Sequence, residues 1–308
     1  MTPPTRRSWP ARSVEAGVEV LSGIGAACVA TALLWARQEQ IVWQPPGRGG
    51  PDPGAPPAGA RRLTYTAEDG QALLAWVVDP PPAAPGTAAP TLLAFHGNAE
   101  LAAWGVPWAR AVAARTGWRV ALPEYRGYAG LGGRSGHDAS RRDARAALAA
   151  VGADAGDGRS PVAAVFGHSL GSAVAAELAV EMAAGGAPPG VLVLQAPFTS
   201  IRDMTRLFAP APLGAWWTRI GRIHFDTAAR VAELDVPVWV THGALDLIVP
   251  QRLGRAVHAA ARRPGEWLGL PTAGHNDVPA VGGVRYWAWL ERALAAAVPA
   301  ERVVRVAP

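Results

Sequence analysis

Short apolar runs alternate along the chain with longer runs in which apolar residues recur at helical spacing. Runs of about four to eight apolar residues are typical of strands buried on both faces, and the longer pattern is typical of amphipathic helices. The predicted strands are residues 91–95, 118–122, 162–166, 191–195, 236–241 and 266–270. The predicted helices are residues 104–115, 138–151, 172–184, 251–261 and 284–297. Repeated strand–helix units predict a parallel sheet covered by helices on both faces, with functional groups on the loops at the carboxyl ends of the strands.

Two strand-like runs, residues 61–66 and 71–78, precede this series. They flank Glu68-Asp69-Gly70, in which the glycine can supply the positive φ of a tight turn. We therefore expect a β-hairpin at the start of the folded part, which makes the sheet mostly rather than wholly parallel.

The N-terminal part of the chain differs in composition from the rest. Residues 1–19 are polar and basic, residues 20–36 are apolar and carry no charge, and residues 37–60 are rich in proline and glycine. Proline and glycine at this density can neither continue a helix nor bury a face, so the third segment is predicted to be a linker. A folded domain is then expected over residues 61–298, followed by a tail over residues 299–308.

The apolar segment 20–36 is at the lower end of the length that crosses a bilayer as a helix, and Trp35 and Trp43 lie where interfacial aromatics would. A membrane anchor is the first interpretation. Two others stay open: a signal peptide with the small residues Ala30-Thr31-Ala32, whose cleavage would give a secreted protein, and a buried helix. Arginines before the segment slightly outnumber those close after it, which predicts that the domain faces the extracytoplasmic side.

Composition excludes some classes of function. Half of the 308 residues are hydrophobic, so a large core is available, and the formal net charge is +5. All residues counted as Lys or Arg are arginines and they are dispersed, without a basic stripe interleaved with aromatics, so no nucleic-acid partner is expected. The single cysteine, Cys28, excludes an intrachain disulfide and a cysteine-rich zinc site. No set of His, Asp or Glu has metal-ligand spacing, so neither a metal nor another cofactor is expected.

The residues Gly167-His168-Ser169-Leu170-Gly171 stand between a valine-rich strand and an alanine-rich helix. In this context a Gly-x-Ser-x-Gly pattern forms a nucleophile elbow, a tight turn that presents the serine hydroxyl at the edge of a sheet. The glycines leave room for the helix to approach the strand closely. The pentapeptide alone is a weak signal in a glycine-rich chain, but its position between strand and helix makes Ser169 the candidate nucleophile.

A serine hydroxyl needs a base to remove its proton, and an imidazole does this when a carboxylate orients it. Both groups follow predicted strands later in the chain: Asp246 after residues 236–241, and His275 after residues 266–270. Other acids in less suitable positions stay open as the orienting carboxylate, namely Asp203, Asp226 and Asp235. The histidines His96, His168 and His242 are expected to satisfy neighbouring polar groups, and Asp277 is expected to cap the last helix.

Five motifs occur in a fixed order: His96-Gly97-Asn98-Ala99-Glu100, Tyr125-Arg126-Gly127-Tyr128, the serine pentapeptide, Gly243-Ala244-Leu245-Asp246 and Gly274-His275-Asn276-Asp277. In this set and order the chain resembles the α/β-hydrolase family, over residues 61–298. With the apolar N-terminal segment, it is similar to the membrane-anchored branch near the serine-aminopeptidase group.

This resemblance implies the α/β-hydrolase fold, with Ser169 as nucleophile, His275 as general acid/base and Asp246 as the orienting carboxylate. It also implies that Leu170 and Asn98 each donate a backbone N–H to the oxyanion. Asn98 would then act through its main chain, so no role is expected of its side chain.

We therefore expect a serine hydrolase that cleaves an ester or thioester of an acyl or lipid-like substrate through an acyl-enzyme. A serine peptidase uses the same three side chains and stays open, as does a membrane-tethered binding protein without turnover. Residues 198–226 are long enough for one or two cap helices, and the glycine-rich loop 126–135 leaves the shape of the substrate open. The apolar side chains of the insertion could pack on the sheet or line an acyl pocket; they are Met204, Leu207, Phe208, Trp216, Trp217 and Ile220. Nothing in the sequence indicates an oligomeric state.

Overall fold

The computed structural model describes residues 29, 31–33, 35–46, 56–82, 89–155, 162–209 and 211–298. These residues form an eight-stranded sheet with the strand order β1-β2-β4-β3-β5-β6-β7-β8. The strands are β1 (Arg61–Thr66), β2 (Ala72–Val78), β3 (Thr91–Phe95), β4 (Arg119–Pro123), β5 (Val162–His168), β6 (Val191–Gln195), β7 (Pro237–Gly243) and β8 (Arg263–Leu270). The β1–β2 and β2–β4 pairs are antiparallel, and every pair from β4 to β8 is parallel. The predicted mostly parallel sheet is confirmed.

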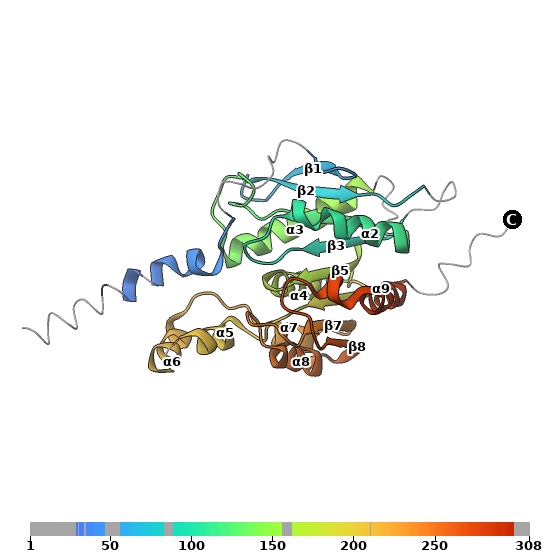
Figure 1. Cartoon of the computed structure of the whole chain (residues 1–308). Coiled ribbons are helices and arrows are strands. Elements are labelled where there is room, and N and C mark those ends of the chain that lie inside the picture. The colour runs from blue at the N-terminus through green and yellow to red at the C-terminus, as the bar shows by residue number, and fades with distance from the viewer. Residues whose placement is uncertain are drawn as a thin grey trace, which may run out of the picture.

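Helices cover both faces of this sheet, as predicted (Figure 1). The short helix η1 (Ala102–Gly105), α2 (Val106–Thr116) and α9 (Val278–Ala297) pack on one face. The other face is covered by α3 (His137–Asp154), α4 (Leu170–Ala184), α7 (Thr227–Glu233) and α8 (Gln251–Ala260). The sequence did not predict α7. The range of α9 includes a first helical turn before Gly283, where φ is +49° and the backbone is not helical, and the predicted helix 284–297 follows this break.

The apolar strands owe their composition to this double cover. In β3, Leu92 and Ala94 point into the core beneath α2 and α9, whereas Leu93 and Phe95 point into the core on the opposite face. All four side chains are buried. A strand covered on both faces has no polar positions, which is why it appears in the sequence as an uninterrupted apolar run.

The insertion after β6 contains two helices, α5 (Ile201–Phe208) and α6 (Ala211–Ile220). A helix that ends at residue 42 lies at the same end of the molecule as α5 and α6 (Figure 1). We call residues 35–44, which include the last turns of this helix, the N-terminal wall.

The sequence predicts a linker over residues 37–60, but residues 35–42 are helical and Trp43 is buried. The Trp43 ring packs 5.5 Å from that of Phe225, measured between ring centroids. The helix docks through its end, where Trp43 is buried in the core and Val42 packs against it.

Most of the predicted apolar helix 20–36 lies outside the described residues. Of the helices that are described, none combines the length and the apolar character that a bilayer span requires.

The start of α4 lies in backbone contact with the neighbouring strands. A Cβ atom at Gly171 would stand 2.3 Å from the carbonyl oxygen of Phe95, and one at Gly167 would stand 2.2 Å from the carbonyl oxygen of Gly171. Backbone atoms of a packed sheet cannot yield to such contacts. Glycine is therefore required at both positions.

We predict that Gly171→Ala lowers the free energy of unfolding by about 3 kcal/mol or more, because the methyl group overpacks a rigid contact. Gly152→Ala is the matched control, since a Cβ there meets no atom within 4 Å and the position is in α3. The control should raise the stability by up to about 1 kcal/mol through helix propensity. Urea unfolding of the two variants measures the difference, and equal midpoints would contradict the prediction.

Candidate active site

Ser169 occupies the turn between β5 and α4, with φ +51° and ψ −118°. A non-glycine residue rarely adopts this conformation, and the surrounding structure must hold it in place. The Ser169 N–H donates to the carbonyl oxygen of Gln195 at 2.9 Å, and the Ser169 carbonyl accepts from the N–H of Ser172 at 2.9 Å. The serine therefore sits on a strained turn that is bonded to the end of β6 and to the first turn of α4.

The structure brings Ser169, His275 and Asp246 together at the carboxyl ends of β5, β8 and β7. His275 Nε2 lies 2.9 Å from Ser169 Oγ, and His275 Nδ1 lies 2.6 Å from Asp246 Oδ2. An imidazole that donates its Nδ1–H to the carboxylate presents the lone pair of Nε2 to the serine hydroxyl. This arrangement can move the hydroxyl proton onto the imidazole.

Asp246 is buried and held by several donors. Its Oδ1 accepts the N–H groups of Ile248 at 2.9 Å and Val249 at 2.7 Å, and His242 Nε2 lies 3.1 Å from Oδ2. Burial by itself would raise the pKa of the Asp246 carboxyl, but hydrogen bonds from His242, His275 and the Val249 N–H outweigh it and hold the pKa well below its usual value. The carboxyl is therefore an anion at neutral pH.

Leu170 and Asn98 line the same cavity as Ser169. Leu170 is the first residue of α4, and Asn98 lies in the loop after β3. The side chain of Asn98, for which the sequence predicts no role, makes three hydrogen bonds. Its Nδ2 donates to the Val42 carbonyl at 2.6 Å, and its Oδ1 accepts from the Gln44 N–H at 2.9 Å and from the Tyr128 hydroxyl at 2.8 Å.

Two buried histidines near Ser169 each lie between a carboxylate and a backbone carbonyl. His168 contacts Glu100 at 3.0 Å and the His275 carbonyl at 3.2 Å, and His96 contacts Glu124 at 2.9 Å and the Gly97 carbonyl at 2.8 Å. Since all four partners are acceptors, both nitrogens of each ring must donate to satisfy them, which requires the imidazolium form. The sequence predicts no role for either carboxylate, although Glu100 ends the His-Gly-Asn-Ala-Glu motif and Glu124 follows β4.

The pKa values of the His168–Glu100 pair agree with this geometry. Burial by itself lowers the pKa of His168, but the hydrogen bond and the charge of Glu100 outweigh it and raise the pKa. Burial by itself raises the pKa of Glu100, but the hydrogen bond and charge of His168, the Gly97 N–H and the charge of His96 together outweigh it and lower the pKa to about 2. The folded structure therefore favours the charged form of the pair, which connects the loop after β3 to the loop of His275.

The other acids considered from the sequence contact groups other than His275. Asp203 accepts hydroxyl hydrogen bonds from Thr199 and Ser200, and Asp226 caps α7 through the Ala229 N–H. Asp235 faces Arg263 at 3.9 Å.

The prediction that Asp277 caps the last helix is wrong. Asp277 stands at the N-cap position of α9, but its side chain makes no capping bond there. Its Oδ1 accepts the Gly274 N–H at 2.6 Å instead, because the chain turns back on itself over the three positions from Gly274 to Asp277. The carboxylate thereby steadies the residue before His275.

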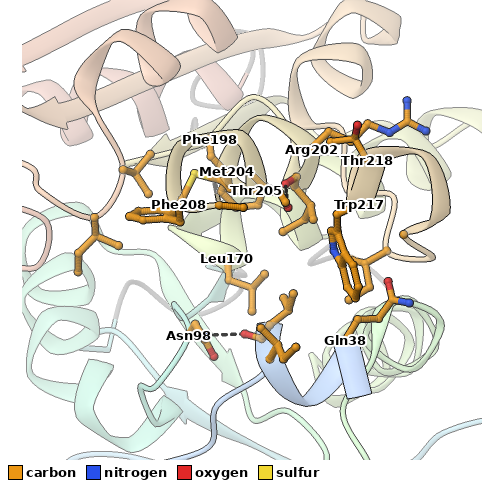
Figure 2. A pocket seen from close by; sticks show the side chains of 18 of the residues that line it. Gln38, Asn98, Leu170, Phe198, Arg202, Met204, Thr205, Phe208, Trp217 and Thr218 are labelled. Atoms are coloured by element: carbon orange, nitrogen blue, oxygen red, sulfur yellow. Dashed lines mark hydrogen bonds between the residues drawn. The ribbon is translucent and has the colours of Figure 1, made fainter. Parts of the chain in front are cut away.

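Two cavities meet at Ser169. The first, of about 480 Å³, lies between the N-terminal wall and the helices α5 and α6 (Figure 2). It is mainly apolar, and its lining includes Ile41, Val42, Phe198, Met204 and Phe208. The second, of about 610 Å³, lies on the side of His275 and includes polar residues such as His96, Glu100 and Gln195. A substrate that reacts at Ser169 can thus extend to both sides of the hydroxyl, with apolar surface on both sides and the polar residues His96, Glu100 and Gln195 on the side of His275.

Metal-ligating side chains are not clustered in the part of the chain that the structure describes. No group of three or more His, Cys, Asp or Glu residues there could hold a metal ion.

Comparison with other sequences finds related proteins, although no protein-family model matches the chain. It is 34% identical over 260 residues to Rv2307c, an uncharacterized protein of Mycobacterium tuberculosis, with 81% of this chain and 84% of that protein covered. It is 32% identical over 291 residues to the alpha/beta hydrolase domain-containing protein WAV2 of Arabidopsis thaliana, with 86% and 90% covered. A shorter match of 30% over 156 residues is to the lysophosphatidylserine lipase ABHD12 of Macaca fascicularis, with 47% and 38% covered.

Solved esterase structures share the architecture. A bacterial heroin esterase superposes with a TM-score of 0.61 at 21% identity, over 78% of this chain and 85% of the esterase. The Pyrococcus furiosus esterase Pf2001 superposes with a TM-score of 0.58 at 16% identity, over 77% and 89%. At these identities the likeness shows a shared fold and nothing finer.

We predict that the His168–Glu100 pair makes stability depend on pH. Folding raises the pKa of His168. The contribution of its charge to the free energy of unfolding is therefore complete below the unfolded-state pKa of about 6.5 and is lost as the pH rises through the folded-state pKa. The stability lost in His168→Gln should therefore be largest near pH 6 and should shrink towards pH 9.5. Glu100, with its lowered pKa, stays charged throughout this window.

Urea unfolding of the wild type and of His168→Gln at several pH values measures this difference. Glu100→Gln should lose the same pH-dependent part of the free energy of unfolding, because the substitution removes the charge that raises the pKa of His168. A stability difference that stays constant from pH 6 to pH 9.5 would show that His168 does not carry the charge.

Proposed function

The chain belongs to the α/β-hydrolase family of esterases and lipases, and on this premise we propose that it is a serine hydrolase that cleaves an ester or thioester through an acyl-enzyme. The observation that carries the proposal is the hydrogen-bonded series Ser169–His275–Asp246. We assign Ser169 as nucleophile, His275 as general acid/base and Asp246 as the carboxylate that orients and stabilises the imidazole.

In the first half of the reaction, Ser169 Oγ attacks the carbonyl carbon of the substrate while its proton passes to His275 Nε2. The imidazolium that forms is stabilised by the Asp246 anion at Nδ1, 2.6 Å away. Asp246 keeps its position during this step because main-chain N–H groups hold its other oxygen. The tetrahedral intermediate then expels the alcohol or thiol, which takes the proton from His275.

The second half repeats these roles with water. His275 removes a proton from a water molecule that attacks the acyl-enzyme, and then returns the proton to Ser169 Oγ as the acid leaves. In both halves the carbonyl oxygen becomes an oxyanion, and we assign its two donors to the backbone N–H groups of Leu170 and Asn98. One such donor is typically worth a factor of about 10²–10³ in rate.

The substrate we propose is an ester of one acyl chain and a polar alcohol. The cavity beside α5 and α6 is mainly apolar and suits an acyl chain. The cavity on the side of His275 has His96, Glu100 and Gln195 within a largely apolar lining, and these polar groups suit the leaving alcohol. One relative is named a lysophosphatidylserine lipase, which is an enzyme for an ester of this class. The match to that lipase covers 38% of its length, so the headgroup of the substrate is left open.

We also propose that residues 20–36 anchor the protein in a membrane with the domain on the extracytoplasmic side. The support is the uncharged apolar sequence, its arginine-rich N-terminal flank and the lipid-like substrate class. Fractionation of cells that express the full chain tests the anchor: the protein should stay with membranes in alkaline carbonate. Release into the soluble fraction would overturn the anchor and leave the hydrolase assignment unchanged.

We predict that Ser169→Ala lowers kcat for p-nitrophenyl esters by at least about 10⁴-fold, because no other hydroxyl replaces the nucleophile. The same variant should not be labelled by a fluorophosphonate probe. Asp246→Asn should lower kcat by about 10⁴-fold, since an amide favours the wrong tautomer of His275.

Asp203→Asn is the matched control, because Asp203 contacts Thr199 and Ser200 rather than His275. It should keep kcat within about threefold of the wild type. Activity or labelling that persists in folded Ser169→Ala would overturn the proposal. Turnover of aminoacyl anilides in preference to esters would assign the same site to a peptidase.

A further inference from the structure

The N-terminal wall, residues 35–44, forms one side of the apolar cavity beside Ser169. Gln38, Ile41 and Val42 contribute to the lining from this segment. Figure 2 shows Gln38 next to Trp217 of α6, with Met204 and Phe208 of α5 on the opposite side of the cavity. The cavity is thus assembled from segments that lie more than 150 positions apart in the chain.

Polar contacts attach the wall to the residues that follow α6. The buried Gln38 side chain accepts the Arg222 N–H at 2.7 Å and donates to the Trp35 carbonyl at 2.9 Å. Trp35 Nε1 donates to the Ile220 carbonyl at 2.8 Å, and the Arg222 guanidinium lies 4.2 Å from the centroid of the Trp35 ring. These contacts set the width of the cavity, because they fix the wall relative to α6.

Asn98 attaches the other end of the wall to the active-site loop. Its side-chain amide bonds two main-chain groups of the wall, the carbonyl of Val42 and the N–H of Gln44, in addition to the Tyr128 hydroxyl. Figure 2 shows the bond from Asn98 to the wall as a dashed line. An asparagine amide can meet one donor and one acceptor of a main chain at once, which an aliphatic side chain of the same size cannot.

The main chain around Asn98 needs such support. Gly97 precedes it, and Ala99 follows it with φ +55°, a conformation that a residue with a side chain rarely adopts. The Gly97 N–H donates to Glu100 at 2.8 Å, and the Gly97 carbonyl lies 2.8 Å from His96 Nδ1. The bonds from the Asn98 side chain attach the loop to the wall as well.

We propose that the N-terminal wall is a working part of the active site, and that the Asn98 side chain is a positioning group that uses the wall to hold the Asn98 N–H towards the oxyanion. The proposal rests on the proposed function. It assigns the wall two effects: Ile41 and Val42 select the length of the acyl chain, and the bonds of Asn98 to Val42 and Gln44 support the rate for every ester at this site. The segment before the domain is thereby a determinant of substrate choice and rate, and not a spacer.

The effect on rate is tested with Asn98→Ala in the full chain. Loss of the side chain should lower kcat for p-nitrophenyl acetate by about tenfold and leave KM within about twofold, because a misplaced donor weakens the transition state and not the binding of a short ester. The affinity for methaneboronic acid, which forms a tetrahedral adduct on a serine hydroxyl, should fall by about the same factor. Tyr128→Phe, which removes one of the three bonds, should fall between the wild type and Asn98→Ala in kcat.

A general loss of stability would not produce this pattern, since it would lower the folded fraction without changing the affinity of the folded molecules for the boronic acid. Assays are therefore run below the unfolding transition of each variant. Wild-type kcat and wild-type boronic acid affinity in folded Asn98→Ala would overturn the role of the side chain.

The effect on chain length is tested with Ile41→Trp, which narrows the cavity from the side of the wall. The ratio of kcat/KM for p-nitrophenyl dodecanoate to that for the acetate should fall by about tenfold. Leu33→Trp is the matched control, because Leu33 is an exposed apolar residue of the same helical segment that does not line the cavity. A wild-type ratio in Ile41→Trp would overturn the role of the wall in selecting the acyl chain.

Failure of this inference is distinguishable from failure of the proposed function. If Ser169→Ala is inactive while Asn98→Ala and Ile41→Trp behave as the wild type, the hydrolase assignment stands and the inference is overturned. If Ser169→Ala retains full activity, the proposed function is overturned first.

Discussion

The backbone contact between the start of α4 and the strands beneath it is the constraint on which the active-site end of the molecule depends. Gly171 lies against the carbonyl oxygens of Phe95 and His96 with no room for a side chain. This close approach leaves Ser169 in a turn with positive φ and sets the loop after β3 beside the first turn of α4. Backbone packing therefore places the turn of Ser169 and Leu170 beside the loop that carries Asn98.

Contacts between carboxylates and histidines tie the remaining loops to this region. Glu124 pairs with His96, Glu100 with His168, and Asp246 lies between His242 and His275. A buried carboxylate without its partner is strongly destabilising, so the loops that carry these groups hold their positions together. The candidate site is preorganised in this sense: supporting side chains fix the groups that would touch a substrate before the substrate binds.

The N-terminal wall is packed against the folded domain, although its sequence predicts a linker. Its sequence looks like the boundary between an apolar helix and a proline-rich linker, and such boundaries are usually peripheral to a folded domain. In the structure Trp43 is buried against Phe225, and Gln38 and Asn98 provide polar contacts at both ends of the wall. The apolar cavity beside Ser169 is complete only with this segment in place, so the segment that leads towards the N-terminal apolar helix also shapes the site.

The sequence by itself determined the strand and helix pattern, the parallel character of the sheet and the residues that carry the candidate chemistry. Local signals suffice there: apolar strands are short, elbow glycines flank a serine, and Asp246 and His275 each follow a strand. Tertiary structure alone decided that Glu100 and Glu124 contact two histidines, that Asp277 bonds Gly274 instead of capping α9, and that residues 35–44 meet Asn98 and α6. These contacts join groups through space or through an irregular loop, and neither apolar periodicity nor motif spacing encodes which polar atoms meet there.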